Sequence, residues 1–157
     1  MRNATLIALA VLLVAVAVAQ QTGTNKQVAD AVIGMVKAQW AAENQKDTAT
    51  AMKDIADDYS EFNGAYATRI EGKAQAARFS EAEAKASTSS VVSEMGNPKV
   101  QVYNDDVAIL SYNYMGVLRD KDGKNEPARA KSTRVYVKQG GTWKLVHANF
   151  GADPVPK

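Results

Sequence analysis

The sequence has no cysteine and only one histidine, His147, among its 157 residues. These absences exclude disulfide bonds, thiol nucleophiles and the multi-histidine sites that commonly bind zinc or iron. The sequence also has no large excess of charge of one sign, because 19 basic and 17 acidic side chains leave a formal net charge of +2. Nucleic acids and anionic membrane surfaces require a concentrated cationic face. We therefore expect no metal, no cofactor and no nucleic-acid partner.

The N-terminal segment has the composition of a secretory signal peptide. Arg2 precedes an apolar run from Ala4 to Ala19, and Ala17-Val18-Ala19 matches an Ala-x-Ala cleavage site. This run is shorter than the roughly 20 apolar residues that a membrane-spanning helix needs. We predict a signal peptide over residues 1–19, whose removal takes away Arg2 and lowers the formal charge to +1. The mature chain, residues 20–157, is then a single periplasmic or secreted domain that meets a membrane only during export.

Helical patterns dominate the first half of the mature chain. Thr24 and Gln27 form a capping box, after which apolar residues recur at helical spacing. Charged side chains near the third helix are typical of a solvated face. The predicted elements are a helix over Lys26–Lys46, a second helix from Asp47 to about Asp58, a hairpin between Tyr59 and Ile70, and a helix over Lys73–Ala86.

From Ser89 onward the helical period disappears and strand-like segments follow. The predicted strands are Val91–Met95, Lys99–Tyr103, Val107–Arg119, Ala128–Lys138 and Thr142–Phe150. Short turns rich in Gly, Asn and Asp separate them, so neighbouring strands should pair antiparallel. Helices followed by a strand meander predict an α+β domain, in which the helices cover one face of a curved antiparallel sheet.

The second half of the chain resembles a known family. Its segments, in order, are Asn97-Pro98-Lys99-Val100-Gln101-Val102, Asp106-Val107-Ala108, the Asp122-Gly123 turn, Thr133-Arg134-Val135-Tyr136 and Gly141-Thr142-Trp143-Lys144-Leu145-Val146-His147. They are similar in order and spacing to the association domain of calcium/calmodulin-dependent protein kinase II and its free-standing bacterial relatives. These proteins belong to the nuclear transport factor 2-like superfamily, which also holds SnoaL-like cyclases and ketosteroid isomerase. The similarity continues, more weakly, over the early helices.

This resemblance implies a fold and an assembly. The fold is the cone-shaped nuclear transport factor 2-like (cystatin-like) fold, in which a curved antiparallel sheet wraps around a long N-terminal helix and a pocket opens between them. Family members associate through the outer face of the sheet, which implies a homodimer or a larger homo-oligomer. Two departures reduce the positive charge of the pocket: the family's second histidine is Asn149 here, and a pocket arginine of the family aligns with Tyr114.

The resemblance and strand alternation together indicate the pocket residues. Arg134 is the most informative, because a buried guanidinium is costly without an anion partner. That partner is either a ligand carboxylate or an internal side chain, with Glu61, Asp57 and Asp58 as candidates. For His147 two interpretations stand. The ring either carries a proton or hydrogen-bonds to a ligand, or the backbone or Asn149 satisfies both ring nitrogens. The predicted ligand-binding residues are Trp40, Tyr112, Tyr114, Arg134, Tyr136, His147 and Asn149.

Two functions follow from these residues. The first is an exported, oligomeric, association-domain-like protein that binds a small molecule or a short peptide, with no catalysis evident. The alternative is a SnoaL-like or isomerase-type enzyme that works without a cofactor. Its candidate catalytic residues are His147, Tyr114 and Asp58. The base is His147 or a carboxylate from Asp57, Asp58 or Glu61, and the hydrogen-bond donor is Tyr112 or Tyr114. A structural alternative is a pocket filled by the protein's own side chains.

Overall fold

The computed structural model describes residues 24–85 and 89–153 of the chain. The predicted signal peptide, residues 1–19, lies outside the described residues, and its cleavage stays a prediction. Over the two described ranges, no helix is both long enough and apolar enough to cross a membrane.

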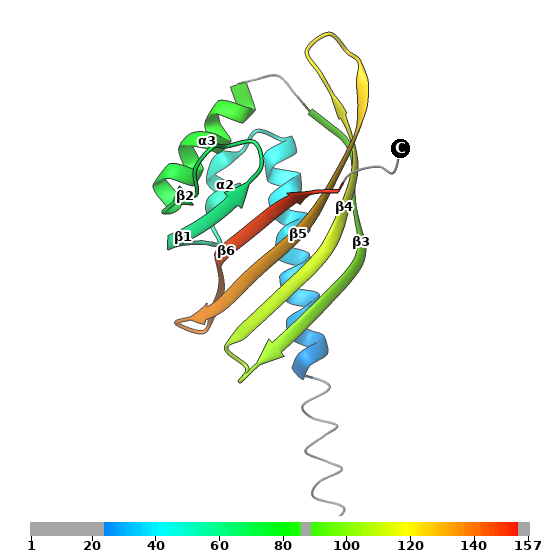
Figure 1. The fold of residues 1–157 in the computed structure, drawn as a ribbon. Coiled ribbons are helices and arrows are strands. Elements are labelled where there is room, and N and C mark those ends of the chain that lie inside the picture. The colour runs from blue at the N-terminus through cyan, green and yellow to red at the C-terminus, as the bar shows by residue number, and fades with distance from the viewer. Residues whose placement is uncertain (1–23, 86–88, 154–157) are drawn as a thin grey trace, which may run out of the picture.

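The strands form one curved sheet against which the helices pack. The described elements are the N-terminal helix (residues 24–44), α2 (Thr48–Met52), β1 (Ile55–Asn63), β2 (Ile70–Glu71), α3 (Lys73–Lys85), β3 (Ser89–Tyr103), β4 (Val107–Arg119), β5 (Asn125–Gln139) and β6 (Thr142–Ala152). The sheet has six strands in the order β2-β1-β6-β5-β4-β3, and only β1 and β6 pair parallel. Figure 1 shows the N-terminal helix lying across this sheet, with α3 beside β1 and β2. The predicted α+β architecture is confirmed.

Helix α2 ends earlier than the sequence predicts. The Asp47 carboxylate accepts a hydrogen bond from the Thr50 backbone N–H at 3.0 Å, which caps this helix as predicted. The helix stops at Met52, however, and the chain from Ile55 onward is strand β1. The predicted continuation to Asp58 is wrong because the β1–β6 pairing is irregular between Ile55 and Ser60, which lets the strand bury side chains at a spacing that resembles a helical stripe.

The long strands agree well with the predicted segments. Strand β4 spans the predicted Val107–Arg119, whereas the two predicted segments before it form the single strand β3. The Gly96-Asn97-Pro98 segment is an irregularity in the β3–β4 pairing and not a turn. The loop after β4 is a tight turn, in which the Asp120 carboxylate accepts hydrogen bonds from the backbone N–H groups of Asp122 and Lys124 at 2.9 Å.

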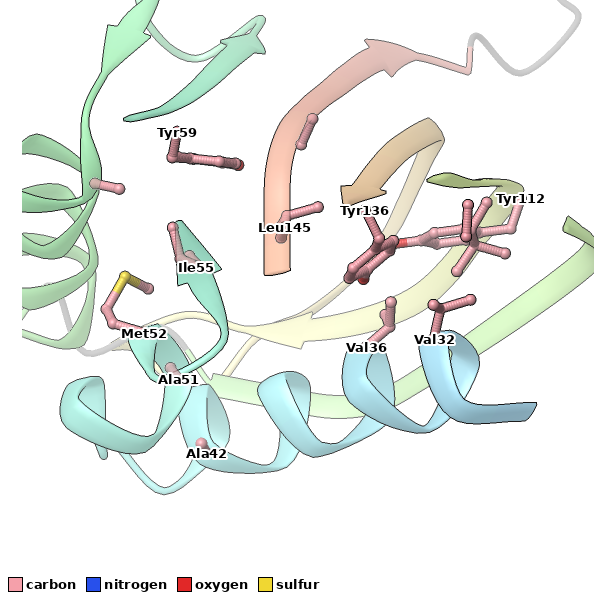
Figure 2. Close-up of a cluster of buried hydrophobic side chains, with 14 of the residues drawn as sticks. Val32, Val36, Ala42, Ala51, Met52, Ile55, Tyr59, Tyr112, Tyr136 and Leu145 are labelled. Atoms are coloured by element: carbon pink, nitrogen blue, oxygen red, sulfur yellow. The ribbon is translucent and has the colours of Figure 1, made fainter. Parts of the chain in front are cut away.

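The core lies between the N-terminal helix and the concave face of the sheet. Val32 and Val36 of the helix are fully buried, and so is Leu110 of β4. Figure 2 shows Val32 and Val36 facing the side chains of Tyr112 and Tyr136. Fully burying a side chain of this size contributes about 1.5–3 kcal/mol. The helix is therefore held to the sheet mainly by apolar contacts.

Candidate functional site

A cavity of about 610 Å³ lies next to this core on the same concave face. The C-terminal half of the N-terminal helix, strand β1 and helix α3 form one side of it, and strands β4 and β5 form the other. The polar and aromatic residues that line it include Gln39, Trp40, Glu43, Glu61, Tyr66, Phe79, Glu83, Tyr112, Tyr114, Ser132, Arg134 and Phe150. Charged, hydroxyl and aromatic groups thus share one concave site.

Arg134 is the buried cation of this cavity, with only 3% of its surface exposed. Its Nε donates to the Tyr112 hydroxyl at 3.1 Å, and its Nη1 donates to Gln39 Oε1 at 2.6 Å. The guanidinium carbon lies 5.1 Å from the centre of the Phe150 ring. Among the described residues no carboxylate oxygen lies within 4.0 Å of Arg134. Because arginine keeps its proton in proteins, the groups in direct contact with this buried charge are neutral, and the nearest negative influence is the more distant Glu43.

This finding decides between the partners that the sequence left open for Arg134. An internal ion pair with Glu61, Asp57 or Asp58 is not formed in the described part of the chain. Asp57 and Asp58 are exposed and do not line the cavity. A buried cation without a close carboxylate is costly, so Arg134 lowers the stability of the fold unless another group compensates its charge.

Gln39 connects Arg134 to a carboxylate on the N-terminal helix. Its Oε1 accepts from Arg134, and its Nε2 donates to Glu43 Oε1 at 2.8 Å. Burial of the Glu43 carboxyl raises its pKa above the ordinary value, and the nearby positive charge of Arg134 opposes this shift. The Glu43 residue is nonetheless exposed, so neighbouring atoms crowd its carboxyl group without sealing it from solvent.

Two more glutamates enter the cavity from other elements. Glu61 on β1 accepts hydrogen bonds from the Tyr59 hydroxyl at 2.7 Å and from Asn63 Nδ2 at 3.0 Å. Glu83 on α3 accepts from the Tyr66 hydroxyl at 2.6 Å. Burial and the adjacent Glu61 raise the pKa of Tyr59, so this phenol remains a neutral donor. Fixed neutral donors therefore orient these carboxylates.

Aromatic residues form the wall beneath the helix. The Trp40 ring meets Tyr112 and Tyr114 edge to face, with ring centres 5.8 and 5.4 Å apart. The Tyr114 hydroxyl lies 3.2 Å from Ser93 Oγ. Gly116 makes room for it, because a Cβ at this position would overlap the Tyr114 hydroxyl. Trp40, Tyr112 and Tyr114 all line the cavity as predicted.

Ser132 is the least satisfied polar group in this wall. Only 3% of the residue is exposed, and its Oγ has no hydrogen-bond partner within the described ranges. A buried hydroxyl without a partner costs about 1–3 kcal/mol. Ser132 precedes Arg134 by two positions on β5, so both side chains point to the same concave face.

His147 and Asn149 lie on the opposite face of the sheet from the cavity. In the β5–β6 pairing Tyr136 is opposite Leu145, while Val135 is opposite His147, so Val146 is an extra residue. This bulge reverses the predicted alternation and turns Ala148 and Phe150 inward instead. The predicted pocket positions of His147 and Asn149 are therefore corrected. The His147 ring lies 2.9 Å from Ser60 Oγ, measured from Nδ1.

Tyr136 and Asp58 are also placed outside the cavity. Tyr136 shares a face with Arg134 as predicted, but it is only 2% exposed and belongs to the core. Burial raises the pKa of Tyr136 to about 12. Asp58 is an exposed residue of β1. Of the three predicted catalytic candidates, only Tyr114 lines the cavity.

The sequence analysis missed several residues that line the cavity. Gln39 and Glu43 stand four positions apart next to Trp40, a spacing that places them on one helix face. Ser132 lies two positions before Arg134 on a predicted strand, so the sequence places both side chains on the same face of the sheet. Glu83 has no such signal, because charged residues on a helix are typical of a solvated surface.

Comparisons with known proteins agree with this fold. The family model for the calcium/calmodulin dependent protein kinase II association domain matches residues 29–154. No match was found among curated protein sequences. The association domain of C. elegans CaMKII is 21% identical, with 82% of this chain and 98% of that chain covered and a TM-score of 0.67.

Two further solved structures are similar in the same way. The S. rosetta CaMKII hub is 22% identical, with 79% of this chain and 95% of that chain covered and a TM-score of 0.65. A nuclear transport factor 2-like superfamily protein of Salmonella enterica is 14% identical, with 84% and 95% covered and a TM-score of 0.71. At these identities the structures establish the fold, which is the predicted one. Because the family model covers most of the sequence, the chain belongs to the calcium/calmodulin dependent protein kinase II association domain family.

Proposed function

We propose that this chain is an exported, oligomeric association domain that binds a small molecule or a short peptide in its cavity. The observation that carries this proposal is the pair formed by Ser132 and Arg134 on strand β5. One is a buried hydroxyl without a partner, and the other is a buried cation without a carboxylate, both within the described residues. An occupant that offers hydrogen-bond acceptors would relieve both costs.

The outer face of the sheet supports the oligomeric part of the proposal. Val107, Ile109, Val135 and Val137 alternate with the buried residues of β4 and β5, and they are only partly buried. They form an apolar strip on the face opposite the cavity. A similar solved structure is described as a hub, which supports homo-oligomerisation of this chain.

Catalysis is not part of the proposal, because the geometry favours no acid–base pair. His147 and Asp58 lie outside the cavity, and the oxygens of Glu61 accept hydrogen bonds from Tyr59 and Asn63. Glu61, Tyr112 and Tyr114 do line the cavity, but no hydrogen bond joins Glu61 to either tyrosine in the described part of the chain.

The ligand is tested by mass spectrometry of the purified protein. The full chain is expressed in a bacterium that exports it, and molecules released on denaturation are identified. We expect a small molecule or peptide in stoichiometric amount with the wild type and with Arg119→Gln, an exposed control. We expect it to be lost from Arg134→Met. This function would be excluded if the wild-type protein released no molecule and its own side chains closed the cavity.

Export and assembly are measured on the same material. The intact mass should correspond to a chain that starts at Gln20, and light scattering should report a dimer or a larger ring. Ile109→Asp should yield monomers, because it places a charge in the apolar strip, whereas Ala67→Asp in the exposed β1–β2 connection should not. A wild type that stays monomeric at high concentration contradicts the assembly, and an uncleaved N-terminus contradicts the export.

A further inference from the structure

The charges around the cavity indicate what kind of molecule it selects. We propose that the cavity prefers a ligand with an ammonium group, whose other end bears a hydrogen-bond acceptor. This inference rests on the proposed function, since it assumes that the cavity binds a small molecule. Its basis is three glutamates without a direct ion-pair partner among the described residues, a set of aromatic rings and the Ser132–Arg134 pair within one cavity.

Carboxylates outnumber cations along the cavity wall. Glu43, Glu61 and Glu83 line it, whereas its cationic residues are Arg134 and Lys46. In the described ranges no lysine or arginine nitrogen lies within 4.0 Å of any of the three carboxylates. Their negative charge is therefore not neutralised by a close cation of this chain.

The groups that contact these carboxylates are neutral donors. Tyr59 and Asn63 donate to Glu61, Tyr66 donates to Glu83, and Gln39 donates to Glu43. Such hydrogen bonds favour the charged form of a carboxylate and fix its direction, but they leave the charge in place. The charges also affect each other: burial is the main cause of the raised pKa of Glu43, the positive charge of Arg134 opposes it, and the negative charges of Glu83 and Glu61 add to it to a smaller extent. A cation in the cavity would reduce this repulsion.

Aromatic rings complete a site that suits an ammonium group. Trp40, Tyr112 and Tyr114 form one wall, and the Tyr66 and Phe79 rings lie 4.2 Å apart beside Glu83. Ring faces attract cations, and the attraction is strongest where the cation is removed from water. A hydrated divalent metal ion is not favoured, because the described residues contain no cluster of three or more His, Asp or Glu side chains able to hold one.

The Ser132–Arg134 pair determines the other end of the ligand. Ser132 Oγ and the Arg134 guanidinium are hydrogen-bonding groups that a carboxylate, phenol or carbonyl oxygen can satisfy. A volume of about 610 Å³ is typical of sites for small organic molecules. The ligand class is therefore a small amine with an oxygen acceptor at its far end.

Three matched compounds test the preference for a cation. Tyramine, tyrosol and 4-hydroxyphenylacetate share a phenol ring and differ only at the other end, which is an ammonium, a hydroxyl or a carboxylate group. Binding to the full oligomer is measured by calorimetry at neutral pH and low salt. Because hydrogen bonds between charged groups are the strong ones, tyramine should bind at least about tenfold more tightly than the other two.

Variants on one helix locate the effect in the cavity. Glu83→Gln should weaken tyramine binding by about tenfold, whereas Glu81→Gln, on the same helix but outside the cavity, should leave it unchanged. Glu43→Gln should also weaken it. Circular dichroism of each variant verifies that the fold is intact.

Each contrary result has a distinct meaning. If tyrosol or 4-hydroxyphenylacetate binds as tightly as tyramine, the preference for an amine is overturned, while the cavity remains a ligand site. If the glutamate variants bind tyramine normally, the preference is overturned as well, because binding then lies elsewhere. If none of the compounds binds and the native protein releases no molecule on denaturation, both the preference and the proposed function are excluded.

Discussion

Strands β4 and β5 provide two different environments along one concave face. Leu110 and Tyr136 belong to the buried core beneath the valines of the N-terminal helix. Arg134, which pairs with Leu110 in the β4–β5 register, and Ser132, two residues earlier, face the cavity instead. Among the described residues the Ser132 hydroxyl has no hydrogen-bond partner, and the Arg134 guanidinium has no carboxylate partner. The first region stabilises the fold, whereas the second costs stability. Polar groups kept at such a cost are typical of binding sites.

This comparison predicts that the buried apolar residues contribute more to the stability of the fold than the residues that face the cavity. Leu110→Ala should lower the free energy of unfolding by about 2–5 kcal/mol, because it removes buried methyl groups and leaves a cavity that only partly closes. Urea denaturation measures this change. Ile109→Ala on the outer side of the same strand is the control, with a smaller loss. If both variants lost the same unfolding free energy, the concave face would not contribute more to stability than the outer face.

Replacing the buried cation should separate stability from binding. Arg134→Met keeps much of the side-chain volume but leaves the Tyr112 hydroxyl and Gln39 without their donor, which should cost about 1–2 kcal/mol. Ligand release, followed by mass spectrometry, should be abolished. A variant that unfolds as readily as Leu110→Ala would show that Arg134 supports the core and does not serve a ligand.

Removing the unpartnered hydroxyl should stabilise the protein. Ser132→Ala eliminates a buried polar group without breaking a hydrogen bond, so the ligand-free protein should gain about 1 kcal/mol in unfolding free energy. The same change should weaken ligand binding. Ser111→Ala on the outer side of β4 should alter neither quantity appreciably. A destabilised Ser132→Ala would mean that the hydroxyl already has a partner.

The smallest expected effect concerns the pH dependence of stability. The folded protein holds the pKa of Glu43 above its ordinary value of 4.5, mainly through burial. The native state therefore binds this proton more tightly than the unfolded state, and stability should fall as the pH rises above the ordinary value and through the folded one. Because the side chain keeps accessible surface, solvent screening limits the effect to less than about 1 kcal/mol.

The measurement compares the wild type with Glu43→Gln. Urea unfolding at about pH 4 and about pH 7 should find the variant relatively more stable at the higher pH, because only the wild type then carries a carboxylate charge that the folded state disfavours. Glu81→Gln on α3 is the exposed control and should follow the wild type at both values. An identical pH response in all three proteins would mean that the cavity does not perturb Glu43.

The regular part of the fold could be predicted from the sequence because long segments obey simple periods. The first half of strand β4 alternates between partly buried and buried positions, and the predicted bounds of the strand agree with the structure. The same alternation placed Arg134 and Tyr112 on the concave face. Prediction failed where backbone pairing overrides the local pattern, as in β1, whose irregular register buries residues at a helix-like spacing.

The prediction of which β6 residues face the cavity failed because the strand contains one extra residue. The extra residue Val146 reverses the faces of β6, so His147 turns toward Ser60 and Phe150 turns into the cavity. No composition or spacing rule reveals such a bulge in one sequence. Glu83 could not be identified either, because only the tertiary packing of α3 brings this charged residue to the cavity.

The central claim is that the Ser132–Arg134 end of the concave face is built to hold a ligand. The most direct measurement is a crystal structure of the exported protein, purified without unfolding. The account predicts a bound molecule with an oxygen atom within hydrogen-bond distance of both Ser132 Oγ and the Arg134 guanidinium. A structure in which Arg134 pairs with a carboxylate of its own chain, and side chains fill the cavity, would contradict it.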